Sequence, residues 1–240
     1  MKNIPLNERI IFALDFAQAE TALDWVARLD AQIKFFKVGL QLFLAGGFPV
    51  IDAIIRRGNK VMVDLKFFDI PETVHLAVQQ LTERGITFAT VHGNEPMIAA
   101  ALRDRKELQI LAVTVLTSFD QNDLRRMGIT IPLTELVLER ARQALALGSD
   151  GIVASAQEAA MLRRHLGTDF TIVTPGVRPA GSARADQVRV TTARQAIING
   201  ADHLVIGRPI KNDPQPQKLV ATLLQEISKA LLDKLNGENI

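Results

Sequence analysis

The 240-residue chain contains no cysteine. It can therefore form no disulfide, no thiolate nucleophile and no zinc–thiolate site. This composition suits a reducing compartment.

Long apolar runs are also missing from the sequence. No stretch approaches the ~18 consecutive apolar residues that a membrane-spanning helix needs. The first apolar run, Ile10–Leu14, is too short for the core of a signal peptide and ends at Asp15. We therefore expect a cytoplasmic protein.

The chain has little excess of either charge. It carries 28 Lys and Arg against 26 Asp and Glu, a formal net charge of +2. Such a balance does not provide a nucleic-acid-binding surface. With 48% hydrophobic residues, the chain is long enough for one large buried core.

Short apolar runs alternate with segments of helical periodicity, such as Thr21–Leu29 and Leu133–Leu147. This alternation indicates crossover units and a parallel sheet. The eight predicted strands are Ile10–Leu14, Phe35–Val38, Val61–Leu65, Phe88–Val91, Ile110–Thr114, Gly151–Val153, Thr171–Thr174 and His203–Ile206.

A weak repeat supports the same organisation. A helix end, a glycine and then a strand recur at Gly58, Gly85, Gly148 and Gly200. Eight strand–helix units in 240 residues predict an α/β fold, a (β/α)8 TIM barrel, with residues 1–240 as a single domain. An open doubly wound sheet is the alternative. The amphipathic segment Gln217–Leu235 is expected to close the barrel.

The segment Asp64-Leu65-Lys66-Phe67-Phe68-Asp69 directly follows an apolar run. Charged side chains are costly to bury unless they are paired. Side chains alternate along a strand, so Asp64 and Lys66 should point the same way, and Asp69 should lie just past the strand end. We predict a carboxylate–ammonium–carboxylate cluster; a purely structural ion-pair network is the alternative.

The neighbouring carboxylates limit what Lys66 can do. A Schiff-base lysine must be neutral, whereas nearby carboxylates favour the ammonium form. Lys66 is therefore predicted to be a proton donor or an electrostatic stabiliser. Asp64 and Asp69 could instead bind magnesium, but Lys66 and Lys37 would compete for the same carboxylates.

Other polar residues follow the predicted strands, at the barrel end where catalytic groups collect. They are Asp15, Lys37, His92, Thr117, Ser118, Arg178, Gly207 and Arg208. Gly207-Arg208-Pro209 suits a phosphate, or is a turn with a surface arginine. Residues 175–187 form a long loop that could be a lid or a surface loop.

The four histidines share no metal-ligand spacing. His92 lies at a predicted strand end and could touch the site. His75 and His165 lie in helical segments and are expected to be solvated.

The ten residues from Asp64 to Thr73, Asp-Leu-Lys-Phe-Phe-Asp-Ile-Pro-Glu-Thr, closely resemble the signature of orotidine 5′-phosphate decarboxylases. The resemblance extends over the chain and is to the short, monofunctional bacterial type. It includes the motifs Ala13-Leu14-Asp15, Phe36-Lys37-Val38-Gly39, Thr90-Val91-His92-Gly93, Leu116-Thr117-Ser118, Thr174-Pro175-Gly176-Val177-Arg178 and Ile206-Gly207-Arg208-Pro209.

The resemblance implies decarboxylation of orotidine 5′-phosphate to uridine 5′-phosphate, without metal or organic cofactor. It implies that Lys66 protonates C6 and that Lys37, Asp64 and Asp69 complete the charged network. It further assigns Asp15 to the ribose and Thr117 to the pyrimidine. The residues that it implies at the phosphate or its lid are Arg178, Gln187, Gly207 and Arg208.

The resemblance also implies a homodimer in which Asp69 and Thr73 reach into the partner's site. Two other functions stay open. A metal-dependent sugar-phosphate decarboxylase or aldol-type synthase should carry an acidic metal ligand where this chain has Lys37. A catalytically silent nucleotide-binding protein should bind its ligand without converting it.

Overall fold

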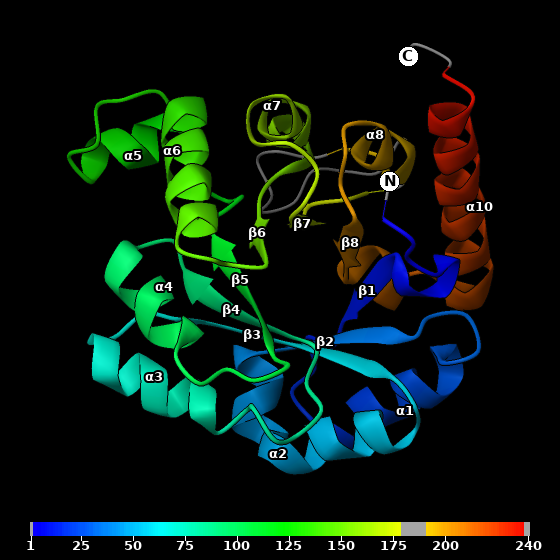
Figure 1. Ribbon diagram of the computed structural model, residues 1–240. Coiled ribbons are helices and arrows are strands. Elements are labelled where there is room, and N and C mark those ends of the chain that lie inside the picture. Colours follow the sequence, from blue (N-terminus) through cyan, green and yellow to red (C-terminus); the bar gives the residue numbers. More distant parts are fainter. Residues whose placement is uncertain (1, 179–190, 238–240) are drawn as a thin grey trace.

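The computed structural model describes residues 2–178 and 191–237. Within them, eight parallel strands pair in sequence order and close into a barrel, as Figure 1 shows. The strands are β1 (Ile10–Ala13), β2 (Phe35–Gly39), β3 (Lys60–Phe67), β4 (Phe88–His92), β5 (Gln109–Val113), β6 (Gly151–Val153), β7 (Thr171–Thr174) and β8 (His203–Ile206). The predicted TIM barrel is confirmed, and the open sheet is not.

Helices connect the strands and cover the outside of the barrel. They are η1 (Leu6–Glu8), α1 (Ala19–Leu29), α2 (Leu40–Arg56), α3 (Pro71–Gln79), α4 (Glu95–Leu102), α5 (Gln121–Arg126), α6 (Leu133–Ala146), α7 (Ala156–Leu166), α8 (Ala193–Ile198), α9 (Arg208–Lys211) and α10 (Pro216–Leu235). The expected C-terminal helix is α10, which packs against α8, α9 and η1. Among the described helices, none has the length and apolar character to cross a membrane.

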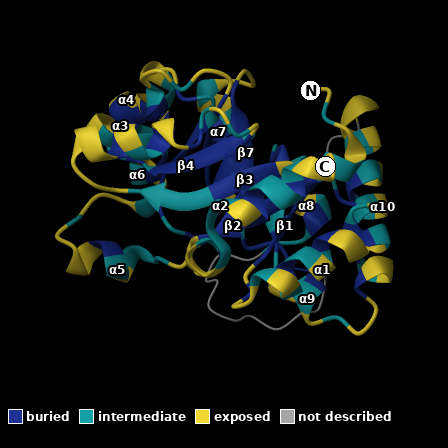
Figure 2. Ribbon diagram, turned by 90° about the horizontal axis from the view of Figure 1, so that it is seen from below, coloured by how far each residue is buried: buried dark blue, intermediate teal, exposed yellow. Residues whose placement is uncertain are grey.

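Burial explains why the strands read as continuous apolar runs. Strands of a parallel barrel are covered on both faces, by helices outside and by one another inside. Every residue of β1 and β2 is buried, and Figure 2 shows the strands dark blue beneath helices with exposed outer faces. Inside the barrel, the rings of Phe35 and Phe88 lie 5.1 Å apart, and His203 meets each edge-on at 5.5 Å.

The glycine repeat marks the helix-to-strand turns. Gly58, Gly85, Gly148 and Gly200 all have a positive φ, between 71° and 107°, a conformation that costs glycine little. Gly200 also needs the space: a Cβ there would lie 2.7 Å from Cγ of Arg163.

Candidate active site

A row of alternating charges lies across the carboxyl ends of three adjacent strands. Lys37 Nζ in β2 lies 3.1 Å from Oδ1 of Asp15, which follows β1, and 3.6 Å from Oδ2 of Asp64 in β3. Lys66 Nζ, also in β3, lies 2.9 Å from Asp64 Oδ1. Asp64 thus has one ammonium group near each oxygen, and the predicted convergence of Asp64 and Lys66 is confirmed.

The inner members of this row are charged although they are buried. The side chains of Lys37 and Asp64 are 10% and 12% exposed. Burial alone would lower the pKa of Lys37, but Asp64 and Asp15 outweigh it and raise that pKa overall. Burial alone would raise the pKa of Asp64, but Lys37 and Lys66 outweigh it and lower that pKa. At neutral pH the pair is therefore an ammonium and a carboxylate.

A buried hydroxyl fixes Asp64 and Lys66 relative to each other. Thr90 in β4 donates from Oγ1 to Asp64 Oδ1 at 2.9 Å and accepts the backbone N–H of Lys66 at 3.0 Å. Thr90 has no exposed surface. Thr90 belongs to the motif Thr90-Val91-His92-Gly93, but the sequence alone predicts no role for it; its only signal is one hydroxyl between Ala89 and Val91 in an apolar strand.

The backbone at Lys66 departs from a regular strand. Val63 pairs with Ala89 and Phe67 with Val91, so four steps along β3 match two along β4. Lys66 has φ 49°, a left-handed conformation that costs a non-glycine residue about 1–3 kcal/mol. Strain of this kind persists where the surroundings hold the residue, and here the hydrogen bond from the Lys66 N–H to Thr90 Oγ1 helps to hold it.

The charged row forms one wall of a pocket of about 240 Å³ at the carboxyl end of the barrel. The pocket is lined by Ala13, Asp15, Lys37, Met62, Asp64, Lys66, Val113, Val115, Leu116, Thr117, Ser118, Val153, Pro175, Gly176, Arg178, Val205, Gly207 and Arg208. Apolar side chains of the barrel interior, such as Met62 and Val113, make its floor. An apolar floor with a few polar groups converging on it is typical of small-molecule sites.

The part of the pocket after β7 and β8 is basic. Arg178 follows β7 and is 9% exposed, and its Nη1 donates to the carbonyl of Val177 at 3.2 Å. Arg208 begins α9 directly after Gly207, whose backbone lies so close to β1 that a Cβ would be 3.1 Å from that of Ala13. Two guanidinium groups on one wall suit an anion with several oxygens, such as a phosphate.

Asp69 and Thr73 do not line this pocket. Both are exposed, and Asp69 Oδ1 accepts the backbone N–H of Ile70 at 2.7 Å. Asp69, the third member of the predicted acid–base–acid cluster, thus lies outside the pocket that Asp64 and Lys66 line, and its assignment to the partner's site stays a prediction. Gln187 lies outside the described residues, as does most of the predicted lid.

The histidines take no part in the pocket. His92 Nδ1 lies 2.7 Å from Asn94 Oδ1, and its ring packs on Phe68 at 4.7 Å. The expectation that His75 is solvated is wrong: it is buried on the inner face of α3, beside Val74 and Val78. In the described part of the chain, no three His, Cys, Asp or Glu side chains are grouped to hold a metal ion.

Residues 8–223 match the model of the family described as "Orotidine 5'-phosphate decarboxylase / HUMPS family". The chain belongs to this family. It is similar to orotidine 5′-phosphate decarboxylases of Methylococcus capsulatus, 48% identical over 90% of both chains, and of Stenotrophomonas maltophilia, 44% identical over 94% of this chain and 95% of the relative.

Solved structures agree with the sequence relatives. A crystal structure of orotidine 5′-phosphate decarboxylase from Lactobacillus acidophilus matches with a TM-score of 0.79 and 33% identity, over 92% of this chain and 99% of that one. A conserved protein of Geobacillus kaustophilus, described as uncharacterized, matches with a TM-score of 0.78 and 31% identity, over 91% and 99% of the two chains. The family resemblance read from the motifs is confirmed.

Proposed function

We propose that this protein converts orotidine 5′-phosphate into uridine 5′-phosphate and carbon dioxide, the last step of de novo pyrimidine nucleotide synthesis. The observation that carries the proposal is the charged row ending at Lys66, 2.9 Å from Asp64, in the same pocket as the basic wall of Arg178 and Arg208. The names of the relatives support the same substrate.

The arrangement suggests how the reaction proceeds. The bond between C6 and the carboxylate breaks, carbon dioxide leaves, and the electron pair stays on C6. The Lys66 ammonium group stabilises that carbanion and then donates the proton that forms the new C6–H bond. Lys37 and Asp64 hold the ammonium group in place, and Lys66 regains its proton from solvent.

The remaining lining groups bind the ends of the substrate. Arg178, Arg208 and the close-packed Gly207 backbone take the phosphate, Asp15 takes the ribose, and Thr117 takes the pyrimidine. Gln187 is assigned to the phosphate by the family resemblance alone. Because the phosphate lies away from C6, its binding energy can be used to order loops around the reacting ring.

We further propose that the protein is a homodimer in which Asp69 and Thr73 complete the partner's site. Three large apolar side chains beside them are exposed: Phe68 by 61%, Ile70 by 67% and Leu76 by 51%. Apolar surface of this kind is typical of an interface. A second copy would cover it while bringing both polar residues to a pocket that they do not reach in their own chain.

Mixed dimers test this sharing. Lys66→Ala and Asp69→Ala homodimers should each be nearly inactive. After subunit exchange, mixed dimers should regain activity, because one of their two sites then has both residues intact. Exchange without recovery would show that both residues act within one chain.

A metal-dependent sugar-phosphate reaction is the second candidate that the sequence leaves open, and Asp15 and Asp64 are the pocket carboxylates that could bind its cation. Lys37 argues against it on geometry: its ammonium group lies 3.1 Å from Asp15 and 3.6 Å from Asp64. A divalent cation bound by those carboxylates would meet that positive charge directly.

Turnover with and without metal separates the candidates. The protein should bleach the orotate absorbance of orotidine 5′-phosphate equally well with a chelator and with added magnesium. Lys66→Ala should reduce kcat at least 10²-fold, whereas Lys229→Ala, an exposed lysine of α10, should not. Tight binding of uridine 5′-phosphate without turnover of the substrate would refute the proposed activity and support a silent binding protein.

A further inference from the structure

A second cavity, of about 200 Å³, lies at the opposite, amino-terminal end of the barrel. Arg9 precedes β1 and Asp202 precedes β8, while Arg163 comes from α7 and Lys234 from α10. Lys2, near the start of the chain, completes the set. Along a four-residue strand, at ~3.3 Å per residue, this cavity lies roughly 13 Å from the active-site pocket.

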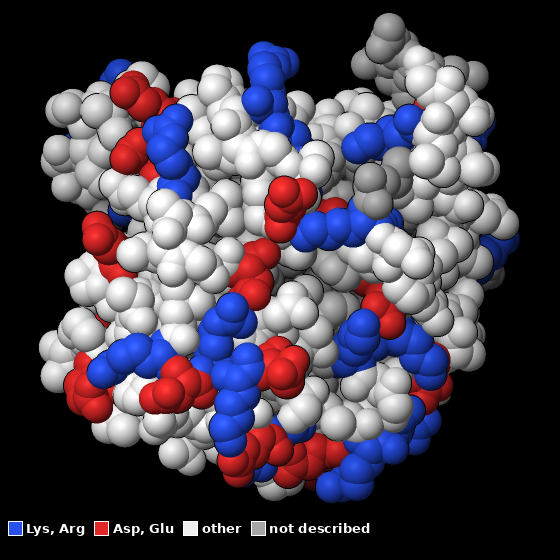
Figure 3. Space-filling view, in the orientation of Figure 1, with Lys and Arg blue, Asp and Glu red and all other residues white. Residues whose placement is uncertain are grey.

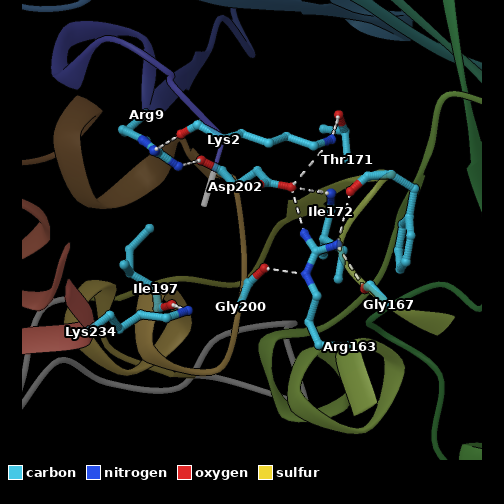
Figure 4. Close-up of polar contacts among 11 residues, drawn as sticks. Lys2, Arg9, Arg163, Gly167, Thr171, Ile172, Ile197, Gly200, Asp202 and Lys234 are labelled. Atoms are coloured by element: carbon cyan, nitrogen blue, oxygen red, sulfur yellow. Dashed lines mark hydrogen bonds and ion pairs between the residues drawn. The ribbon is translucent and has the colours of Figure 1, made fainter. Parts of the chain in front are cut away.

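Positive charge exceeds negative charge in this cavity. Four cations line it, Lys2, Arg9, Arg163 and Lys234, and among the described residues Asp202 is the one acid that does. Figure 4 shows Lys2 and Arg163 reaching the Asp202 carboxylate from different sides, at 4.0 and 2.6 Å from Oδ2. One carboxylate cannot neutralise four cations, so the lining has an excess of three positive charges.

Part of this set is a structural clamp. Arg163 donates to the carbonyls of Gly200 and Phe170 at 3.0 and 2.9 Å as well as to Asp202. It thereby ties α7 to the turns that enter β7 and β8. This role accounts for Arg163 and Asp202, but it does not require the other three cations.

The hydrogen bonds of the other three cations end on neutral groups. Lys234 Nζ donates to the carbonyl of Ile197 at 3.1 Å, and Lys2 Nζ donates to Thr171 Oγ1 at 2.8 Å. Arg9 is 3% exposed and donates to the carbonyls of Asp202 and Lys2. Its buried Nε has no hydrogen-bond partner within residues 2–178 and 191–237, and a buried donor without an acceptor costs about 1–3 kcal/mol.

Electrostatics points the same way. Burial lowers the pKa of Arg9, and it lowers that of Lys2, on which Arg163 acts in the same direction. Asp202 raises both pKa values, and Asp169 and Asp150 also raise that of Lys2. These carboxylates do not outweigh the lowering. An added anion would favour the charged form of both side chains.

We propose that this cavity binds a phosphoryl oxyanion, at a site separate from the active-site pocket. Guanidinium and ammonium groups together suit the oxygens of such an anion. The volume of about 200 Å³ is below the ~300–1,000 Å³ typical of drug-sized ligands. The occupant is therefore free phosphate or pyrophosphate, or the phosphate end of a nucleotide whose remainder projects into solvent.

Calorimetry on matched variants tests the site. Arg208→Ala serves as the background, because it weakens the phosphate wall of the active-site pocket. Three proteins are compared in that background. The first has no further change, the second carries both Lys2→Gln and Lys234→Gln, and the third carries Lys229→Gln, which removes a positive charge from α10 outside the cavity. Each protein is titrated separately with inorganic phosphate, pyrophosphate and uridine 5′-triphosphate.

We expect binding that the double glutamine variant weakens about tenfold or more and that Lys229→Gln leaves unchanged. Binding of the inorganic ions identifies a free-ion site, and binding of the triphosphate alone identifies a nucleotide phosphate. No binding at millimolar ligand, or equal binding by all three proteins, would overturn the proposal.

Two further measurements keep the test independent of folding and of catalysis. If the double variant fails to fold, the titrations are repeated with Lys234→Gln alone. Lys234 is an exposed residue in the last turns of α10. With Arg208 intact, neither glutamine variant should change turnover of orotidine 5′-phosphate, because the cavity lies at the other end of the barrel. Anion binding is measured without turnover, so a failure of the proposed activity would leave this result interpretable.

Discussion

Thr90→Val removes the hydroxyl that links Asp64 to the backbone of Lys66 while keeping the shape of the side chain. Two hydrogen bonds are lost, at 2.9 and 3.0 Å, and one of them ends on a carboxylate. A hydrogen bond to a charged group contributes about 1.5–3 kcal/mol, and the Lys66 N–H loses its acceptor as well. We therefore expect the free energy of unfolding to fall by about 2–4 kcal/mol.

The same change should slow the reaction. Without Thr90, the positive φ of 49° at Lys66 loses one of the contacts that hold it, and the ammonium group shifts relative to C6. A misplacement of about 1 Å can reduce a rate ~10²-fold. We expect kcat to fall ~10–100-fold with a smaller change in KM, because Thr90 does not line the pocket.

Steady-state decarboxylation and urea unfolding measure the two effects. Thr90→Ser keeps the hydroxyl and should retain most of the activity. Thr174→Val is the matched control: Thr174, the last residue of β7, is also fully buried, but its Oγ1 has no hydrogen-bond partner among the described residues. The reasoning is refuted if Thr90→Val keeps wild-type kcat, or if both valine variants lose the same stability.

Two other changes have equally specific outcomes. Burial against Phe35 and Phe88 lowers the pKa of His203 from 6.5 to about 4. The imidazole is therefore protonated more readily in the unfolded chain than in the folded one. Roughly 3 kcal/mol of stability, complete above pH 6.5, should be lost as the pH falls toward 4. Urea unfolding of the wild type between pH 7.5 and 4.5 should show this slope, and His203→Phe should lack it. In Gly39→Ala, the new Cβ would lie 2.8 Å from Lys37 Nζ, so kcat/KM should fall ~10–100-fold with little change in stability. Gly58→Ala is the control, at φ 76° with open space around it. It should lose about 1–2 kcal/mol of stability and keep its activity. Similar changes in activity and stability in the two variants would contradict the steric argument.

The sequence predicts the barrel well because burial on both faces makes each strand a continuous apolar run. Every predicted strand is found, with ends that differ by at most two residues. The largest difference is in β3, which continues through Lys66 to Phe67. Charged residues there indicated a strand end, whereas the irregular pairing with β4 keeps them in the sheet.

The site is predictable where a residue type carries its chemistry locally. Asp64, Lys66 and Lys37 stand out as charges beside apolar runs. Thr90 does not stand out, because threonine is common in strands for its branched shape alone. On the face that Figure 3 shows, acidic and basic side chains are interspersed rather than gathered by sign, which fits the near-balanced charge of the sequence.

The basic cavity could not be found in this way. Its cations come from three distant parts of the chain: positions 2 and 9 precede β1, position 163 lies in α7 and position 234 in α10. Each is unremarkable in its own segment. Only the closed barrel brings the segments before β1 and β8 together with α7 and α10.

The barrel closes where the first strand meets the last, since β8 pairs with β1 from Ile10 opposite Leu204 to Phe12 opposite Ile206. The active-site pocket spans this seam: Asp15 follows β1, and Arg208 follows β8. Synthesis on the ribosome proceeds from the N-terminus, so the charged row is made long before the strand beside which it must work. A nascent chain that stops before His203 exposes the unpaired edges of β1 and β7 and lacks one arginine of the basic wall. The complete pocket can therefore form only near the end of translation, once β8 is available to pair with β1.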